Sequence, residues 1–506
     1  MNPHRARKPV DEFDDSPIKY PSQLPKNSDG KNPNVMIVGA GLAGLLLAIL
    51  LDKAGIPYEI YERAASVKPL GSIMVLNANI LAAIDQIGLL EELEAISFPG
   101  NKANIMYDNL AIAASFDSLN KDNEVGYEHL HFSRPKFHEL LLSKVPKEKI
   151  HYNKKVMSMI QNKEGVMIRC ADGTTYHGDI LVGADGAHSG VRQGLYRTLQ
   201  EKNILPQSDA TEMSKGFLAM VGTTDPMDPE QYPFLKNNTS TFNQVIGRGT
   251  SFNWSEFNMP ENRVCWVIVS QVASIAEFEQ IKFRNSEWGP ESNPEFIDQV
   301  KDFKVPGCGT LGNLINATPE ANISRVFLEE KLFETWSHGR TVLIGDAAHK
   351  LLPSAGQGAV CALQDAVVLA NCLYDLESLD RDAIHAAFLD YKEQRFNHVA
   401  EMYGKSKMNA IVLYGQTLKE RIIRHIILNW IPESVKIKEL HKGAAYRPMV
   451  TFLPPIPKKG KIELLPQKPS VRYEREQKKK AEEEALKSQA VAEDVPYPIV
   501  SPAEAV

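Results

Sequence analysis

A glycine-rich turn near the start of the chain restricts the fold more than any other feature of the sequence. Residues 39–44 read Gly-Ala-Gly-Leu-Ala-Gly and directly follow a short apolar run at 35–38. A helical pattern begins within the turn and continues to residue 53, and residues 58–61 alternate as a strand does. Strand, turn, helix and strand at this spacing form a βαβ unit, which predicts a parallel sheet.

The three glycines of this turn have different tasks in a dinucleotide site. Gly39 permits the tight turn, Gly41 lets a pyrophosphate approach the backbone, and Gly44 allows the helix to pack closely on the strand. The N–H groups at the start of the helix then face the phosphates. Glu62 ends the second strand, where a carboxylate accepts hydrogen bonds from an adenosine ribose and disfavours a 2′-phosphate. A glycine turn without a ligand is the alternative, but strand, helix and Glu62 together favour FAD or NAD.

Two later motifs distinguish FAD from NAD. One apolar strand pattern ends at Asp185 and Gly186, and another ends at Asp346, followed by a glycine-rich turn at 353–359 and a long apolar helix. A carboxylate at a strand end can accept hydrogen bonds from polyol hydroxyls, and a helix N-terminus beyond it stabilises negative charge. An NAD site needs neither feature. FAD has a ribityl chain and a ring that becomes anionic when reduced, so the two motifs favour FAD.

In this order, the three motifs resemble those of the FAD-dependent hydroxylases of the para-hydroxybenzoate hydroxylase type, the group A flavoprotein monooxygenases. The resemblance covers about residues 34–402. Within the group, the chain is most similar to fungal FAD monooxygenases and epoxidases of the paxilline-pathway kind, partly through Tyr-Arg-Pro at 446–448 and Thr-Phe-Leu-Pro at 451–454. The resemblance implies an α/β chain (α+β overall): a Rossmann-like FAD-binding domain, an inserted mixed β-sheet substrate domain and C-terminal helices.

The resemblance also implies which residues bind the cofactor. Arg134 matches the arginine that reaches FAD from the helix after the first sheet, and Asp185 matches a motif associated with both FAD and the nicotinamide cofactor. Asp346 is expected at the ribityl chain, and the N–H groups of Gly358 and Ala359 are expected at the flavin pyrimidine edge. The full expected set is Gly39, Gly41, Gly44, Glu62, Arg63, Val75, Arg134, Asp185, Gly186, Asp346, Gly358 and Ala359.

The chemistry implied by the family begins with hydride transfer from NAD(P)H to FAD. O2 then adds to the reduced ring as a hydroperoxide, and one oxygen atom passes to an electron-rich aromatic ring or alkene, as hydroxylation or epoxidation in secondary metabolism. No metal is required, and the sequence marks no catalytic acid or base. One departure from the family pattern is at Gly71 and Ser72, where the family usually reads Gly-Ala-x-Ile before a Pro-Asn pair, and this puts the loop's contact with the flavin in doubt.

Residues at about 216–274 have a strand-like pattern, and we expect them to form a sheet of their own and the floor of the substrate site. Asn253, Trp254 and Gln271 are candidates for lining this floor, with a core or surface role as the alternative for each. Arg134 and Arg192 have a surface salt bridge as their alternative role. His349 is expected to be a packed residue that orients its loop, and Trp336 is expected in the core.

Three other functions are alternatives to oxygen insertion. A flavin-dependent reductase or dehydrogenase acting on an isoprenoid-like substrate uses related motifs without inserting oxygen. A prenyl-binding protein that resembles the GDP-dissociation inhibitors keeps the first glycine motif but has no use for Asp346 and the helix after it. A flavin halogenase needs a Gly-x-Trp-x-Trp signature, and the five tryptophans here do not cluster in that way.

Composition excludes further classes of function. The formal net charge of -6 argues against nucleic acid as a partner, and a small organic substrate with O2 fits better. The N-terminus has no apolar secretory region and no run reaches ~18 apolar residues, so a cytoplasmic protein without a spanning segment is expected. Residues 422–431 are the candidate for peripheral membrane contact, or for a helix packed on the body. The five cysteines are expected to be buried thiols, and the oligomeric state is not indicated.

Changes of pattern along the chain divide it into five expected parts. They are a disordered leader at 1–33, a discontinuous FAD-binding domain at 34–200 and 325–410, a substrate-binding β-sheet domain at 201–324, a C-terminal helical segment at 411–453 and a flexible charged tail at 454–506.

Overall fold

The computed structural model describes residues 32–66, 73–117, 124–271 and 293–493. Almost all of the expected leader lies outside the described residues, as do Gly71, Ser72 and the end of the middle segment near residue 274. Within the described part of the chain, no helix is both long enough and apolar enough to cross a membrane.

One six-stranded sheet carries the sequence motifs. Its strands lie in the order β19-β20-β11-β1-β2-β7, and β1 pairs in parallel with both β2 and β11. Because β11 also pairs in parallel with β20, the carboxyl ends of four neighbouring strands lie at one edge of the sheet. The expected βαβ unit is therefore present. The strands are β1 (Val35–Val38), β2 (Tyr58–Tyr61), β7 (Ile150–His151), β11 (Ile180–Gly183), β19 (Ser337–His338) and β20 (Thr341–Leu343).

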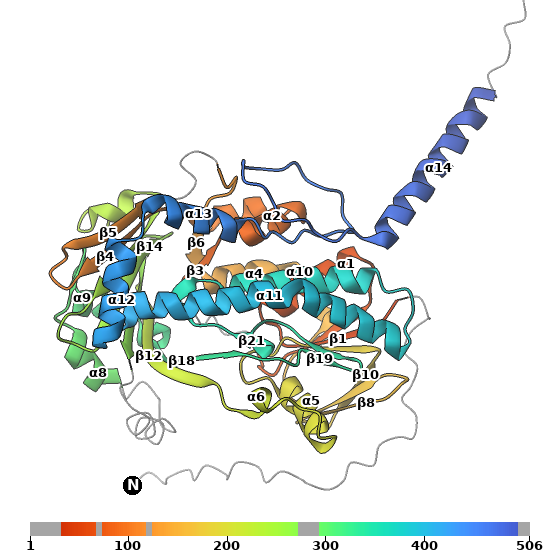
Figure 1. The fold of residues 1–506 in the computed structure, drawn as a ribbon, viewed down its shortest axis with the longest axis horizontal. Coiled ribbons are helices and arrows are strands. Elements are labelled where there is room, and N and C mark those ends of the chain that lie inside the picture. The colour runs from red at the N-terminus through yellow and green to blue at the C-terminus, as the bar shows by residue number, and fades with distance from the viewer. Residues whose placement is uncertain (1–31, 67–72, 118–123, 272–292, 494–506) are drawn as a thin grey trace, which may run out of the picture.

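One apolar helix packs on this sheet, and a second apolar helix packs on the first. Helix α1 (Leu42–Lys53) is buried along nearly its whole length, and α10 (Gly358–Tyr374) is buried from Val360 to Tyr374. Helices that are apolar on every face must be enclosed, and they form the centre of the main core. The longest helix, α11 (Arg381–Tyr414), is capped by the Asp380 side chain and runs across the molecule in front of α10 (Figure 1).

A second, larger sheet forms the other half of the molecule. Its strands lie in the order β21-β18-β12-β15-β14-β13-β4-β6-β3, with β5 paired to β4. The expected strands of the middle segment are present, but the sheet extends beyond the expected limits 201–324 at both edges, because β13 pairs with β4 and β12 pairs with β18. The strands are β3 (Ile73–Leu76), β4 (Ser97–Tyr107), β5 (Ile112–Asp117), β6 (Leu130–Ser133), β12 (Ser214–Thr223), β13 (Ser240–Ile246), β14 (Phe252–Met259), β15 (Arg263–Gln271), β18 (Ser324–Leu332) and β21 (His349–Lys350).

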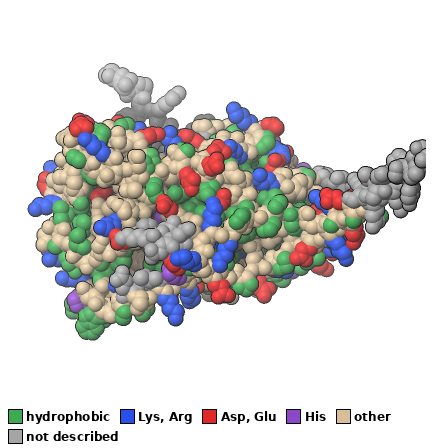
Figure 2. All heavy atoms as spheres, turned by 90° about the horizontal axis from the view of Figure 1, so that it is seen from above, with side chains coloured by type: hydrophobic (Ala, Val, Ile, Leu, Met, Phe, Trp, Pro, Cys, Tyr) green, Lys and Arg blue, Asp and Glu red, His purple; other side chains and the backbone are tan. Residues whose placement is uncertain are grey.

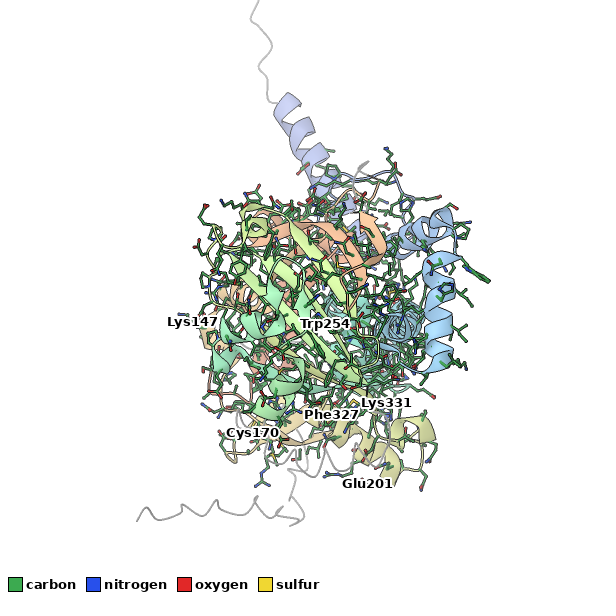
Figure 3. All side chains as sticks on the ribbon, turned by 90° about the vertical axis from the view of Figure 1, so that its left-hand side faces the viewer. Lys147, Cys170, Glu201, Trp254, Phe327 and Lys331 are labelled. Carbon is green, nitrogen blue, oxygen red and sulfur yellow. The ribbon has the colours of Figure 1, made fainter. Side chains whose placement is uncertain are left out.

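The two faces of this sheet have different neighbours. Side chains alternate along each strand, so Trp254 and Trp266 enter a small core under helices α8 and α9, on the outer face. Ala219 and Val269 lie on the inner face, against α11 and the turn before α10. Figure 3 looks onto the outer face. The inner face is the one that meets the half of the molecule with the six-stranded sheet.

The remaining elements cover these two halves. They are the three-stranded sheet β8 (Val156–Gln161), β9 (Val166–Cys170) and β10 (Thr175–Gly178), the pair β16 (Lys304–Val305) and β17 (Gly309–Thr310), and the helices α2 (Ala78–Gln86), α3 (Leu90–Ala95), α4 (Arg134–Ser143), α5 (Gly190–Glu201), α6 (Gln207–Ala210), α8 (Asn293–Val300), α9 (Leu311–Asn316), α12 (Leu418–Asn429), α13 (Glu433–Ala444) and α14 (Val471–Glu493). All five cysteines are buried thiols, as expected. On the face shown in Figure 2, acidic and basic side chains are interspersed.

The C-terminal segment differs from the expected flexible tail over its first part. The Gln86 side chain donates to the Pro454 carbonyl, and Lys461 donates its backbone N–H to the Glu124 carbonyl. Ser470 donates to the Asp375 carboxylate at the end of α10, 2.5 Å away. Side-chain and backbone contacts far apart in sequence therefore hold this segment on the body. Beyond them, α14 projects from the molecule (Figure 1).

Candidate functional site

The carboxylate of Glu62 is fixed beside the glycine turn. Its Oε2 accepts the N–H of Ala40 and its Oε1 accepts the N–H of Ala64, each at 2.8 Å. Each carboxylate oxygen can accept a further hydrogen bond. Glu62 is thus held at the end of β2 with acceptor capacity left for ribose hydroxyls. Arg63 follows it in the chain and is exposed.

The three glycines of the turn are required by different neighbours. Gly39 has a φ of +106°, and a Cβ there would lie 2.6 Å from the Ala184 carbonyl oxygen. A Cβ on Gly44 would overlap the Gly39 carbonyl oxygen. At Gly41, the nearest protein atom to an added Cβ would be 4.0 Å away. The protein's own packing therefore explains the first two glycines, whereas the space at Gly41 is free for a ligand.

The start of α1 is shaped for an anion. Its N-cap, Gly41, supplies no side-chain hydrogen bond to the first turn. The His138 Nε2 donates to the Ala40 carbonyl at 2.7 Å, and burial lowers the pKa of His138. Unpaired N–H groups at a helix N-terminus attract negative charge, and a pyrophosphate supplies it. His138 was not identified from the sequence, and a histidine inside a mixed helix carries no local signal of this role.

The strand end at β20 has the second expected carboxylate. The Lys350 Nζ donates to the Asp346 Oδ2 at 2.6 Å, and a third of the Asp346 side chain is exposed (33%). The following helix, α10, has no side-chain cap from Gln357, and a Cβ on Gly356 or Gly358 would meet no protein atom within 4 Å. An acceptor, an uncapped helix and open glycines thus occur together. This combination fits a polyol chain beside a ring that becomes anionic.

Arg134 is the first residue of α4 and lies close enough to Asp346 for the two charges to interact. Burial lowers the pKa of Arg134, and the Asp346 carboxylate acts in the opposite direction. Two expected residues separated by about two hundred positions are therefore brought to one place. A cavity of about 340 Å³ adjoins the start of α4, and its walls include Ser133 and Pro135 together with Val221 of the inner sheet face. Ala359 and Val75 are half-buried, on α10 and β3.

The Asp185 carboxylate holds its own loop in place through hydrogen bonds. Its Oδ1 accepts the Ser189 hydroxyl at 2.5 Å and its Oδ2 accepts the Val191 N–H at 3.2 Å, so it caps the start of α5. Burial raises the pKa of Asp185. Gly186 has a φ of +82°, and a Cβ there would meet no protein atom within 4 Å. The backbone at Gly186 therefore presents the open surface of this motif, and contact between Asp185 itself and FAD stays a prediction.

Arg192 joins the second and third motifs. It is 6% exposed, and its guanidinium donates to the Ala347 carbonyl at 2.9 Å and the Ala187 carbonyl at 2.5 Å. The surface salt bridge considered as its alternative role is wrong, because burial between two loops leaves backbone oxygens as its partners. The charged side chain holds the two strand ends in a fixed relation.

A buried charge cluster holds the Asp346 loop from the other side. The Asp365 Oδ2 accepts from the Gly345 N–H at 2.8 Å and contacts the His349 Nε2 at 2.6 Å, and the Asp365 Oδ1 accepts from the Arg395 Nε at 2.8 Å. Burial acts to raise the pKa of Asp365, but His349 and Arg395 outweigh it and the pKa is lowered. His349 is therefore a packed residue that orients its loop, as expected. Asp365 and Arg395 were missed, although an acid within the apolar run of α10 was a usable signal.

Trp254 is wrong as a candidate for the substrate floor. It faces the outer side of the sheet, where its Nε1 donates to the Lys304 carbonyl at 2.9 Å. A shift by one residue along a strand reverses the face, and the sequence alone did not fix which face would be inward. Asn253 and Gln271 make structural ties, to the Tyr414 carbonyl and to Glu420. The expected core position of Trp336 is confirmed.

Comparison with known proteins identifies the group. Residues 32–224 and 313–406, more than half of the chain, match the profile of the FAD binding domain family. The chain belongs to this family. The resemblance predicted from the three motifs is thus confirmed.

Two curated relatives of the chain are fungal enzymes. The FAD-dependent monooxygenase ptmM of Penicillium ochrochloron is 28% identical over 390 residues, which cover 74% of this chain and 87% of the relative. The FAD-dependent monooxygenase dpasE of Apiospora sacchari is 28% identical over 435 residues, 83% of this chain and 87% of the relative. The chain therefore spans most of the length of these enzymes.

Solved structures share the fold at lower identity. HpxO of Klebsiella pneumoniae, solved with FAD and uric acid, superposes with a TM-score of 0.65 at 19% identity and covers 82% of this chain and 97% of its own. The 2,6-dihydroxypyridine-3-hydroxylase of Arthrobacter nicotinovorans gives a TM-score of 0.62 at 20% identity, over 77% of this chain and 95% of its own. The expected fold class is confirmed.

Proposed function

We propose that the protein is a monooxygenase that binds FAD, takes reducing equivalents from NAD(P)H and uses O2 to hydroxylate or epoxidise an organic substrate. The substrate class is an aromatic or alkene compound such as a terpenoid, in secondary metabolism. The observation that carries the proposal is the arrangement at the sheet edge. Helices α1 and α10 begin there without side-chain caps, and the carboxylates of Glu62 and Asp346 lie at the same edge. The glycines at these helix starts have no close protein atom where a Cβ would be, so the space beside them is open to a ligand.

Each part of that arrangement has a task toward FAD. The N–H groups at the start of α1 and the open Gly41 would hold the pyrophosphate, and Glu62 would accept from the ribose. Asp346 would accept from the ribityl chain, and the N–H groups of Gly358 and Ala359 would face the pyrimidine edge. When bound, FAD supplies a ring that accepts hydride and reacts with O2.

The substrate would lie against the inner face of the larger sheet. Val221 and Thr223 of β12 and Met259 of β14 line the cavity beside the start of α4. Apolar side chains in this wall suit an aromatic or terpenoid compound, and exclusion of water protects reactive oxygen chemistry from side reactions. No acid or base is assigned to the reaction.

Oxygen incorporation is the decisive measurement. The purified protein should be yellow and should release its FAD on acid precipitation. With isotopically labelled O2, NAD(P)H and a panel of prenylated aromatic compounds, mass spectrometry should find one labelled oxygen atom in the product. Conversion of a substrate without O2 would instead support the reductase of an isoprenoid-like substrate. A colourless protein that takes up no FAD would contradict both and favour a prenyl-binding protein.

A further inference from the structure

Helix α12 presents a row of large apolar side chains to the solvent. Leu418 is 74% exposed, Ile422 53%, Ile426 40% and Trp430, just beyond the helix end, 71%. They are spaced by four residues, so they lie one above the other along one side of the helix. We call this row the α12 ridge. Exposed apolar side chains are common singly, but a continuous row is the pattern of a contact surface.

The opposite side of α12 is fixed to the body, so the ridge cannot turn inward. Arg424 is 6% exposed, and its Nε donates to the Val412 carbonyl at 2.8 Å and its Nη2 to the Gly415 carbonyl. It lies two residues from both Ile422 and Ile426, which is about 200° around a helix. The buried arginine therefore sits diametrically across from the ridge. Figure 3 shows α12 at the outer edge of the molecule, beyond α11, which is seen end-on.

The start of α12 is equally well anchored. Thr417 and Glu420 form a capping box, and Gln271 at the end of β15 donates to the Glu420 carboxylate at 3.3 Å. Nearby, Asn253 donates to the Tyr414 carbonyl at 3.2 Å. The helix that carries the ridge is thus tied to strands β14 and β15 of the larger sheet. Because the helix is already held rigidly, it loses little conformational entropy when its apolar row binds a partner.

Basic side chains border the ridge. Apart from the buried Arg424, five Lys or Arg and three Glu occur between residues 417 and 444, in a chain with a net charge of -6. Lys419 and Arg421 are exposed beside the ridge, whereas Glu420 faces the capping box. The following helix, α13, adds the exposed Val435 (48%) and Leu440 (44%). An apolar row with basic borders is the pattern of a helix that lies in the interface of a membrane containing anionic lipids.

We propose that the α12 ridge binds the surface of an anionic phospholipid membrane, with its apolar side chains in the boundary between headgroups and acyl chains. Trp430 suits this boundary because its ring is apolar and its N–H is polar. A second copy of the chain fits the ridge less well. A symmetric contact places the same patch on both subunits, and the basic borders would then face each other. The proposal does not depend on the oxygen chemistry.

Co-sedimentation of the purified full-length protein with vesicles tests the proposal. Vesicles of phosphatidylcholine with phosphatidylserine should bind the protein, and vesicles of phosphatidylcholine alone should bind it more weakly, with binding falling as salt is raised. The variant Leu418→Ser/Ile422→Ser/Trp430→Ser should lose binding by roughly tenfold or more, since each lost side chain removes apolar area from the contact. The variant Arg421→Glu should weaken binding to the anionic vesicles specifically.

A matched control removes exposed apolar side chains elsewhere. Met157 of β8 and Ile204 after α5 are 42% and 56% exposed, and β8 and α5 lie away from α12 (Figure 1), so Met157→Ser/Ile204→Ser should bind vesicles as the natural protein does. Unchanged FAD content and circular dichroism show that the variants are folded. The proposal is overturned if the natural protein stays in the supernatant with both vesicle types, or if the triple variant still sediments. A dimer that dissociates in the triple variant, without vesicle binding, would assign the ridge to a second copy.

Discussion

At the scale of residues, Gly39, Gly41 and Gly44 lie within six positions of one another, yet different atoms require each of them. Protein backbone fills the space beside Gly39 and Gly44, whereas the space beside Gly41 is open. Gly41 also has a φ of -78°, which alanine adopts without strain. A substitution at Gly41 therefore separates ligand binding from folding.

The two glycines should respond in opposite ways. Gly41→Ala should leave the thermal unfolding of the apoprotein unchanged and weaken FAD binding, because a methyl group would occupy the place of the pyrophosphate. Gly44→Ala should destabilise the fold by about 1–3 kcal/mol, because its methyl group would overlap the Gly39 carbonyl. Scanning calorimetry and flavin fluorescence titration measure the two effects. Full FAD affinity in Gly41→Ala would show that no ligand approaches the turn there.

Asp346 should matter for FAD and little for stability. A hydrogen bond to a charged group contributes ~1.5–3 kcal/mol, so Asp346→Ala should weaken FAD binding by roughly ten- to a hundredfold, and excess FAD should restore part of the activity. Asp298→Ala is the control, because Asp298 also pairs with a lysine, Lys301, at 2.9 Å on the surface. Equal FAD affinity in the two variants would reduce the Asp346 motif to a structural turn.

At the scale of elements, the cluster of His349, Asp365 and Arg395 joins α10 and α11 to the loop after β20. Breaking a buried ion pair leaves a charge without compensation, so Asp365→Asn and Arg395→Met should each lower the free energy of unfolding by about 3–5 kcal/mol. Because both changes break the same contact, the double variant should lose less than the sum. Denaturant unfolding measures this. The exposed pair of Arg475 and Glu377 is the control, where Arg475→Met should leave the free energy of unfolding nearly unchanged, because the pair is exposed to water.

Strand β14 holds a buried acid that makes stability depend on pH. Burial raises the pKa of Glu256 to about 8, against the hydrogen bond from the Asn243 amide, which lowers it. The folded state therefore favours the neutral carboxyl. The neutral Glu256 carboxyl contributes fully to the free energy of unfolding below the pKa that the group has in the unfolded chain, ~4.3. Between that pH and pH 8, the contribution falls by about 1.4 kcal/mol per pH unit. Glu256→Gln should lose this slope in denaturant unfolding measured across that range. An unchanged slope would show that other groups titrate there.

At the scale of the whole molecule, the C-terminal segment clamps the end of α10. Tyr374 donates to the Glu476 carboxylate at 2.6 Å, and Ser470 donates to Asp375. A chain that ends at Pro466 loses both contacts and should melt about 3–6 °C lower, with FAD still bound below the transition. A chain that ends at Lys478 keeps both and should melt as the full chain does. Loss of FAD on the shorter truncation would show that the clamp extends to the site.

The order of motifs along the chain determined the half of the fold around the six-stranded sheet and the positions of most candidate site residues in it. A strand, a glycine turn and a helix are local features, and their glycines are required by atoms a few residues away or by the ligand itself. Glu62 and Asp346 follow directly from strands, so their place at the carboxyl edge of a parallel sheet could be predicted. The family resemblance rests on these same local features, which is why it proved correct.

Only the tertiary structure decided the contacts between segments far apart in the chain. The pairing of β13 with β4 extended the large sheet past its expected limits, and it depends on strands more than a hundred residues apart. The register of β14 put Trp254 on the outer face, although a shift of one residue would have reversed it. Arg424 set the outward direction of the α12 ridge by its bonds to a preceding turn. Periodicity shows that a face is apolar, but long-range packing decides what that face meets.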